Sequence, residues 1–308
     1  MSRIVISGAS GNLGRYVTDL LLEDDAGRAL TLVTRTPSKL AHRVSDNISV
    51  RYGDFTDPAS LDTAYAGGET LLLISSLNVG RRLEEHRNAI AAAKRAGIKY
   101  IVYTSFQGTH PRNPSLASQD HSQTERLLRE SGIEHVVLRD SLYAEIFTNV
   151  VIAAAVPVGE FQMAAGDGII APVSKRDVAH CAVKCLLNPE YHAGAVYELT
   201  GPELISLHDL ARIGSEFHNA PIKYVPVTPQ ERLALLDALG FPRTYSPEMD
   251  KNPAGAMWAS DEMLAGDIAL AQGFHAILSH HVKFITGREP ETLWSVFERC
   301  KGKRYDEL

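Results

Sequence analysis

Cysteine is scarce in this sequence, and the few cysteines present do not have the spacing of a structural framework. The 308 residues include three cysteines, too few for the disulfide scaffold of a small secreted domain. Cys181 and Cys185 lie four residues apart in a helical pattern and therefore share one helix face. A zinc site needs about four ligands at closer spacing. We therefore interpret both cysteines as small core residues and expect no metal.

Long hydrophobic runs and excess basic charge are also missing. The longest apolar run, from Val150 to Val158, is well short of the roughly 20 residues that span a bilayer. The chain leads directly into a strand pattern, so we expect no signal peptide, no membrane segment and a cytoplasmic protein. Lys and Arg number 31 against 37 Asp and Glu, which gives a net charge of -6. Because nucleic-acid affinity depends on neutralising phosphates, we expect no nucleic-acid partner.

What the sequence does contain is a regular alternation of strand and helix patterns. Hydrophobic residues make up 44% of the chain, enough for one large or two modest domains. Continuous apolar strands alternating with helices are typical of a parallel sheet covered on both faces. The expected strands are 3–7, 29–35, 48–52, 69–75, 99–105 and 135–139, and the expected helices are 12–23, 57–66, 81–96 and 118–131. This order predicts a Rossmann-type α/β fold with a doubly wound parallel sheet.

The rhythm changes after about residue 155, where glycine and proline become more frequent. The elements expected beyond it are irregular strands within 159–174, strands at 196–200 and 222–227, and helices at 174–187, 206–218, 228–239, 258–271 and 289–299. We predict an NADP(H)-binding domain at 1–155 and a smaller α/β substrate lobe at 156–308, interwoven with the sheet. This lobe should lie over the carboxyl ends of the strands, where open sheets bind ligands.

The segment VISGASGNLGRYV, near the start of the chain, places three glycines between the first strand and the first helix. Gly8 permits a sharp turn, Gly11 leaves room for a pyrophosphate, and Gly14 lets the helix pack close to the sheet. The helix N-terminus offers amides and partial positive charge to the phosphates. Ser10 and Asn12 can add side-chain hydrogen bonds. Because the triplet follows a strand and opens a helix, we predict a dinucleotide site here.

The charge after the second strand indicates which dinucleotide binds. Arg35 stands where NAD-binding proteins carry an acidic residue for the ribose hydroxyls. A guanidinium can instead pair with a 2′-phosphate, and Arg15 and Lys39 can add charge, so we predict NADP(H). Asp54 and Phe55 follow the third strand, where the adenine of the cofactor should lie.

Several segments resemble the atypical short-chain dehydrogenase/reductase superfamily, and more closely its NmrA-like group. The superfamily resemblance rests on GASGNLG, TRTPSKL, YGDF and IVYTS. The resemblance to the group rests on HRNAIAAAKRAGIKYIVYTS (86–105), DHSQTERLLRESGIEHVVLRDSLYAE (120–145), PVSKRDVAHC (172–181) and TGREP (286–290). It extends over nearly the whole chain. The group includes bacterial NADPH:quinone oxidoreductases, triphenylmethane reductases and redox-sensing regulators.

This resemblance implies a Rossmann domain with bound NADP(H) and a substrate pocket beneath the C-terminal lobe. The end of the fourth strand should face the middle of the cofactor. Together with the residues above, the expected cofactor-binding set is Gly8, Ser10, Gly11, Asn12, Leu13, Gly14, Arg35, Lys39, Asp54, Phe55, Ser75, Ser76 and Ser105.

One departure from the superfamily concerns the catalytic dyad. Most members carry Tyr-x-x-x-Lys on the helix after the fifth strand, whereas the matching stretch here is HSQTE, residues 121–125. The NmrA-like reductases show a similar replacement. The four-residue spacing places His121 and Glu125 on one helix face. Because imidazole titrates near neutrality, we expect His121 to supply a proton with Glu125 orienting it; the alternative is a pair on the helix surface.

Two further residues are candidates for the chemistry. Ser105 matches the position of the superfamily's catalytic serine and can hydrogen-bond a substrate oxygen or the nicotinamide amide. Tyr143 follows the sixth strand and can stack on an aromatic substrate or donate its hydroxyl. The expected pocket walls are Phe106, Gln107, Phe147 and the loop 159–170. His280 and His281 are not expected to bind metal, because adjacent helix residues point apart, and Trp258 and Trp294 are expected to pack in the core or lobe.

The missing tyrosine favours a particular class of acceptor. A positioned acid contributes about 10²–10⁴-fold, or roughly 3 to 5 kcal/mol, whereas holding donor against acceptor contributes roughly 7 to 11 kcal/mol. A quinone or cationic dye stabilises the incoming electron pair by itself and needs little proton help. We therefore predict an NADPH-dependent reductase whose substrate is a quinone or a similar small conjugated aromatic. A homodimer is possible on the sequence alone.

Two other functions remain as alternatives. The first is a non-catalytic NADP(H)-sensing regulator of the NmrA-like kind, which the missing dyad permits. The second is a benzylic-ether (lignan-type) reductase. Glu125 stands where that branch usually keeps a lysine, which weakens the second alternative.

Overall fold

A seven-stranded parallel sheet forms the centre of the molecule. The structure is a computed structural model, and it describes residues 3–245 and 259–305. The strand order is β3-β2-β1-β4-β5-β6-β9, and every neighbouring pair is parallel. The bounds are β1 (Ile4–Ser7), β2 (Leu30–Thr34), β3 (Ile48–Tyr52), β4 (Thr70–Leu73), β5 (Tyr100–Phe106), β6 (Glu134–Asp140) and β9 (Val196–Leu199). The predicted doubly wound α/β fold is confirmed.

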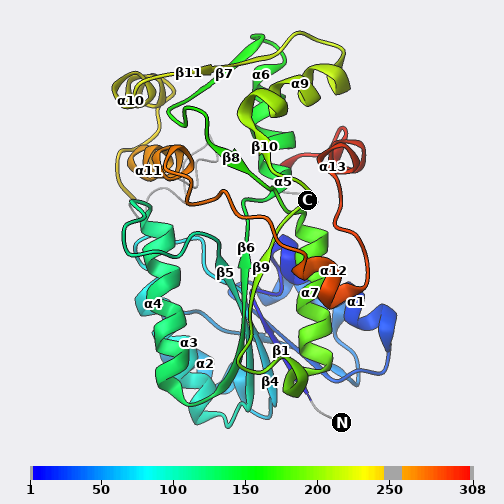
Figure 1. The fold of residues 1–308 in the computed structure, drawn as a ribbon. Helices are drawn as coiled ribbons and strands as arrows, with labels where there is room; N and C mark the ends of the chain where they lie inside the picture. Colours follow the sequence, from blue (N-terminus) through cyan, green and yellow to red (C-terminus); the bar gives the residue numbers. More distant parts are fainter. Residues whose placement is uncertain (1–2, 246–258, 306–308) are drawn as a thin grey trace.

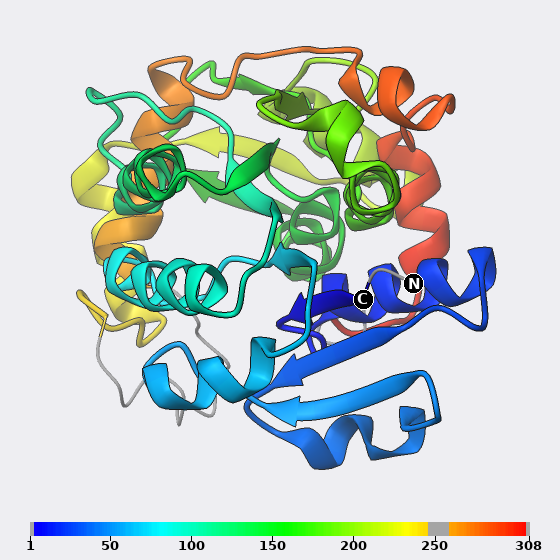
Figure 2. The same cartoon turned by 90° about the horizontal axis from the view of Figure 1, so that it is seen from below.

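Helices cover both faces of this sheet, as Figures 1 and 2 show from two directions. The helices on one face are α1 (Asn12–Asp24) and α7 (Lys175–Leu187), and those on the other are α2 (Pro58–Tyr65), α3 (Arg82–Arg95) and α4 (Leu116–Ser131). All residues of β1 and β2 are buried. Burial on both faces explains why these strands are continuous apolar runs in the sequence.

The alternation of side chains along β5 decides which of them can meet α4. Val102 packs in the core beneath α1 and α7, whereas Ile101 and Tyr103 pack in the core beneath α2, α3 and α4. Since successive strand residues point to opposite faces, Ser105 shares the face of Tyr103 and lies toward α4.

A smaller lobe lies beyond the carboxyl ends of the strands, in the upper half of Figure 1. β7 (Glu160–Met163) pairs in parallel with β11 (Lys223–Pro226), and β8 (Ile169–Ile170) pairs antiparallel with β10 (Ile205–Ser206). The surrounding helices are α9 (Leu207–His218), α10 (Pro229–Ala238), α11 (Ser260–Ala271) and α13 (Leu293–Cys300). The lobe has its own core, which includes Phe161, Leu210 and Phe297.

The chain passes between the lobe and the central sheet more than once. After β7 and β8 the chain returns to form α7 and then β9, which pairs with β6 at the edge of the central sheet. α12 (His281–Thr286) then packs against α7. The domain boundary at residue 155 stays a prediction.

Several short elements were not predicted. They are the 3-10 helix η1 (Pro37–Arg43), the short helices α5 (Ala144–Ile146), α6 (Ala153–Ala155) and α8 (Pro189–His192), α12, and the π-helix η2 (Phe147–Ile152). The last expected helix, 289–299, begins instead at Leu293, because the Thr292 side chain accepts a hydrogen bond from the Ser295 amide and caps it. Trp258 lies outside the described residues. No described helix is both long and apolar enough to cross a membrane.

The C-terminal segment returns to the glycine turn after α13. The Asn149 amide donates to the carbonyl oxygens of Cys300 (3.2 Å) and Lys303 (2.9 Å). The Asn12 amide then donates to the carbonyl of Tyr305 at 3.3 Å. The segment therefore connects α13 to the start of α1.

Candidate active site

The glycine turn between β1 and α1 has the geometry of a phosphate cradle. Gly8 has φ of +85°, a conformation that favours glycine. A Cβ on Gly14 would lie 2.4 Å from the carbonyl oxygen of Gly8, so only glycine fits. Gly8 and Gly11 are exposed. The first amides of α1, those of Asn12, Leu13 and Gly14, have no partner within the helix. The turn can thus present amides to a pyrophosphate, and the binding itself stays a prediction.

The polar side chains of the turn are bonded within the protein. The Ser10 hydroxyl lies 2.7 Å from that of Thr34, at the end of β2. The Asn12 carbonyl accepts from Arg15 at 2.5 Å while its amide holds the Tyr305 carbonyl. Each side chain can still donate to a phosphate, because the Asn12 amide has a second hydrogen and the Ser10 hydroxyl can accept from Thr34.

Exposed cations stand beyond β2, where a 2′-phosphate would lie. Arg35 and Lys39 are exposed, and neither side chain forms a hydrogen bond or ion pair with another described residue. The Asp54 carboxylate accepts from the Thr56 amide (2.9 Å) and hydroxyl (2.8 Å), so it serves a local turn. The half-buried Phe55 ring packs edge-on against His86, at 6.0 Å between centroids. The guanidinium of Arg35 is therefore available to bind the 2′-phosphate, as the prediction requires.

The end of β4 is fixed from both sides. The Ser75 amide donates to the Thr104 hydroxyl at 3.0 Å. The Ser76 amide donates to Nε2 of His86 at 3.2 Å, and its carbonyl accepts from Nε of Arg82 at 2.6 Å. The Ser76 hydroxyl is buried without a partner among the described residues. That hydroxyl therefore has unused hydrogen-bonding capacity at the end of β4.

The predicted partner of Glu125 requires correction. The Ser105 hydroxyl donates to Oε1 of Glu125 at 2.8 Å. Arg139 donates to both oxygens of Glu125, at 2.9 and 2.7 Å, and also pairs with Glu198 at 3.0 Å. Glu125 is buried, 2% exposed. Glu125 therefore does not orient His121. It forms a buried ion pair with Arg139 and accepts the hydrogen of Ser105, whose oxygen can still accept a hydrogen bond; the predicted bond of Ser105 to a substrate or to the nicotinamide amide stays a prediction.

His121 is also different from the prediction in partner and charge. Its Nδ1 lies 2.7 Å from the hydroxyl of Tyr103, on β5. The ring is 4% exposed, so the alternative of a surface pair is wrong as well. Burial, together with the charges of Arg82 and His86, lowers the pKa of His121 well below 6.5. The imidazole is therefore neutral near pH 7, and it can act there as a hydrogen-bond donor but not as a cationic acid.

Tyr143 forms a second polar group at the end of β6. Its hydroxyl donates to Oδ2 of Asp140 at 2.8 Å, and its ring lies 5.8 Å from Nζ of Lys175. Burial raises the pKa of Asp140 well above 3.8. Burial also lowers the pKa of Lys175 to about 8, against the charge of Glu145. Tyr143 is half-buried, and its hydroxyl hydrogen is bound to Asp140.

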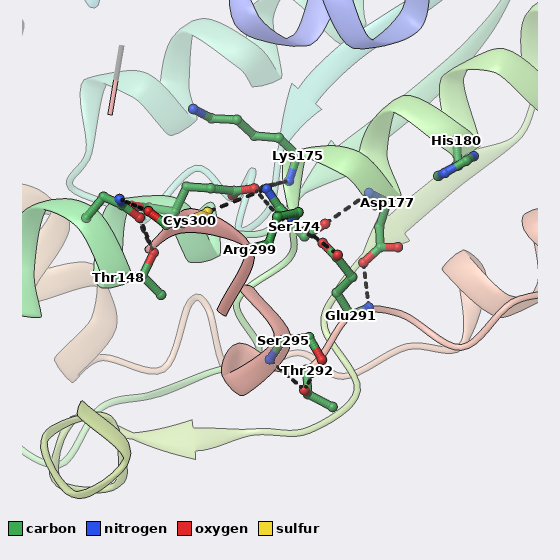
Figure 3. Close-up of polar contacts among 12 residues, drawn as sticks. Thr148, Ser174, Lys175, Asp177, His180, Glu291, Thr292, Ser295, Arg299 and Cys300 are labelled. Atoms are coloured by element: carbon green, nitrogen blue, oxygen red, sulfur yellow. Dashed lines mark hydrogen bonds and ion pairs between the residues drawn. The ribbon is translucent and has the colours of Figure 1, made fainter. Parts of the chain in front are cut away.

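An ion-pair cluster, shown in Figure 3, fixes the lobe beside this site. Arg299 of α13 donates to Glu145 at 2.9 Å and to Glu291 at 2.9 Å. Glu145 is fully buried and also accepts from the backbone amide of Lys175, at 3.1 and 3.2 Å. The Asp177 carboxylate accepts from the amide of Glu291 at 2.7 Å. α13, α5 and α7 are thereby joined where α7 begins.

The predicted pocket walls separate into two groups. Phe106 is half-buried between the rings of His121 (6.0 Å) and His275 (5.1 Å). Gln107 is fully buried, and its Oε1 has no partner among the described residues. Phe147 instead packs in the core of the lobe, together with parts of 159–170. Sequence reasoning missed His275, which is buried with an unpartnered Nδ1.

The remaining candidates have structural roles. Cys181 and Cys185 are buried and free, as expected of core residues. Nδ1 of His281 accepts from the Glu198 amide at 3.0 Å. Trp294 is 42% exposed and packs edge-on against Phe217. Across residues 3–245 and 259–305, no three His, Cys, Asp or Glu side chains are placed to hold a metal ion.

Comparisons with known proteins agree with this geometry. A family model described as NAD(P)H-binding matches residues 8–189. Quinone oxidoreductase 2 of Escherichia coli is 36% identical over 253 residues, 82% of this chain and 87% of that protein. An NmrA-like family domain-containing oxidoreductase of Aspergillus flavus is 26% identical over 74% of this chain and 76% of its own length.

Solved structures give the same result. The NADPH-dependent quinone oxidoreductase of Escherichia coli, complexed with NADPH, matches with a TM-score of 0.85 and 32% identity, covering 96% of this chain and 99% of that one. Triphenylmethane reductase of Citrobacter sp., complexed with NADP(H), matches with a TM-score of 0.84 and 26% identity over the same shares. The chain therefore belongs to the NAD(P)H-binding, NmrA-like family of oxidoreductases.

Proposed function

We propose that this protein is an NADPH-dependent reductase that transfers hydride to a quinone or a similarly conjugated aromatic acceptor. The observation that carries the proposal is the glycine cradle with its open first-turn amides, followed by the unpaired Arg35 at the end of β2. The names of the relatives, a quinone oxidoreductase and a triphenylmethane dye reductase, support this acceptor class.

The residues fit the cofactor, and each has a part in holding it. The amides of Asn12, Leu13 and Gly14 would bond the pyrophosphate, and Arg35 would pair with the 2′-phosphate. Lys39 is near enough in sequence to add charge. The bound cofactor would supply the hydride, and one solvent proton completes the balance from quinone, NADPH and H⁺ to hydroquinone and NADP⁺.

The described side chains favour an acceptor that needs no strong acid. His121 is neutral and buried, so it would donate a hydrogen bond to the acceptor oxygen as negative charge develops there. The half-buried rings of Phe106 and Tyr143 would form its aromatic walls. A simple ketone would need a proton that neither Ser105 nor His121 delivers near pH 7.

The test is a mixture of the protein and NADPH with quinones, triphenylmethane dyes and aryl benzylic ethers, followed by the loss of nicotinamide absorbance. Turnover of quinones or dyes is the expected result. Tight NADPH binding without any turnover would instead identify an NADP(H)-sensing regulator, and turnover of the ethers alone would identify a benzylic-ether reductase. A cytoplasmic location and a homodimer stay predictions.

A further inference from the structure

A buried cluster of polar rings lies between β5 and the helices that cover it. Tyr103 comes from β5, His86 from α3, and His121 and Thr124 from α4. His86, Tyr103 and Thr124 are fully buried, and His121 nearly so. None of these groups except His121 has a role in the proposed reaction. The hydrogen bonds of this cluster, followed from the backbone amide of Ser76, indicate which ring nitrogen or hydroxyl carries each hydrogen.

The first hydrogen is fixed by the end of β4. The Ser76 amide lies 3.2 Å from Nε2 of His86, and a backbone N–H can only donate. Nε2 of His86 is therefore unprotonated. Burial, with the charge of Arg82, lowers the pKa of His86 to about 3, so the ring is neutral near pH 7. The single ring hydrogen of His86 must then be on Nδ1.

The second and third hydrogens follow from the first. Nδ1 of His86 lies 2.9 Å from the Thr124 hydroxyl, which donates its own hydrogen to the carbonyl of Asp120 at 2.8 Å. Thr124 therefore accepts from His86. The Tyr103 hydroxyl lies 3.5 Å from the same Nδ1, which cannot accept because it is protonated. The Tyr103 hydroxyl lies 2.7 Å from Nδ1 of His121, so it can donate to that nitrogen when the nitrogen is unprotonated.

The consequence concerns the far side of the His121 ring. A neutral imidazole that accepts at Nδ1 carries its hydrogen on Nε2. Nε2 forms no hydrogen bond with another described residue, and the ring neighbours the half-buried Phe106. We infer that Tyr103 is a positioning residue, which holds His121 in the tautomer whose Nε2–H can bond the acceptor oxygen. This inference rests on the proposed function for its catalytic meaning, but the tautomer itself does not.

The experiment is Tyr103→Phe, with Tyr65→Phe as a matched control. Tyr65 is also fully buried in the same core, and its hydroxyl lies 3.1 Å from that of Ser7, away from His121. Both variants remove one buried hydroxyl and should lose similar stability. In ¹⁵N spectra of the histidine rings, assigned with His121→Gln, wild-type His121 should show a protonated Nε2 and an unprotonated Nδ1. Tyr103→Phe should mix the two tautomers, and Tyr65→Phe should not.

Kinetics with a quinone give the second measurement. Loss of a fixed donor to developing charge should lower kcat of Tyr103→Phe roughly 10- to 100-fold while KM changes little. Tyr65→Phe should retain the wild-type kcat. A wild-type spectrum with the hydrogen on Nδ1 overturns the inference, even if Tyr103→Phe does not fold. A Tyr103→Phe enzyme with wild-type tautomer and kcat also overturns it. If no quinone is reduced at all, the proposed function fails while the spectrum still decides the tautomer.

Discussion

Two alanine substitutions in the glycine turn should separate folding from cofactor binding. In Gly14→Ala the new Cβ would lie 2.4 Å from the Gly8 carbonyl oxygen and 2.7 Å from Cα of Ala9. Ordinary contacts are about 1 Å longer, and both neighbours are backbone atoms that cannot rotate away. Overpacking of this kind costs about 1–3 kcal/mol of unfolding free energy, and we expect the upper end here. The affinity for NADPH should fall as well, because the added methyl forces β1 and the start of α1 apart.

Gly11→Ala should leave the fold intact and weaken the binding of NADPH. Gly11 has φ of −75°, and its Cβ would lie 3.3 Å from the Gly8 oxygen, so stability should stay within about 0.5 kcal/mol. The methyl would, however, occupy the exposed approach to the first amides of α1. Losing one hydrogen bond to a charged phosphate costs about 1.5–3 kcal/mol, which weakens the Kd for NADPH roughly 10- to 150-fold.

The assays are urea unfolding for stability and calorimetric titration with NADPH for affinity. Gly266→Ala, within α11, is the control, since its Cβ would meet nothing within 4 Å. It should gain about 0.5–1 kcal/mol of stability and bind NADPH as the wild type does. A Gly11→Ala protein with wild-type affinity would refute the placement of the pyrophosphate, and an undiminished stability of Gly14→Ala would refute the packing argument.

Three further predictions concern charge. Arg35→Asp should shift the preference from NADPH toward NADH, measured as the ratio of kcat/KM values, and an unchanged ratio would remove the phosphate assignment. Arg299→Met should cost about 3–5 kcal/mol in urea unfolding because it leaves the Glu145 carboxylate buried without its guanidinium partner, whereas Arg126→Met, which breaks an exposed pair, should cost far less; equal losses would contradict this. Burial raises the pKa of Asp177 to about 6, so the folded chain keeps a proton that the unfolded chain releases, and this contribution to stability should decline between about pH 4 and pH 6. Asp177→Asn should reduce this decline in unfolding free energy with pH, and a variant with the wild-type decline would contradict the assignment to Asp177.

The parts of the fold that the sequence predicted are those set by local pattern. The strands β1, β2 and β4, which are buried at every residue, are mainly apolar runs, and the Gly8, Gly11 and Gly14 spacing lies within one turn and one helix start. The short β8 and β10, of two residues each, carry no such pattern. The π-helix at Phe147–Ile152 likewise has the apolar composition of an ordinary helix.

The candidate site was predicted less well because its partners are far apart in the chain. His121 and Glu125 share a helix face, as their spacing indicated, but each bonds a different residue of the sheet. Tyr103, the partner of His121, is on β5, and Arg139, the partner of Glu125, is on β6. Helical spacing gives the face of a residue, whereas its partner depends on the strand packed beneath it. A signal existed for Tyr103, since the period of two along β5 places it with Ser105.

The course of the last described residues bears on how the protein can be handled. Because the Tyr305 carbonyl is bonded to Asn12, a purification tag joined after residue 308 would begin within about 10 Å of chain from the nucleotide cradle. Such a fusion would compete with coenzyme for space and depress measured affinities. An extension before β1 would leave from the amino end of that strand, whereas the cradle follows its carboxyl end, and would leave that cradle undisturbed.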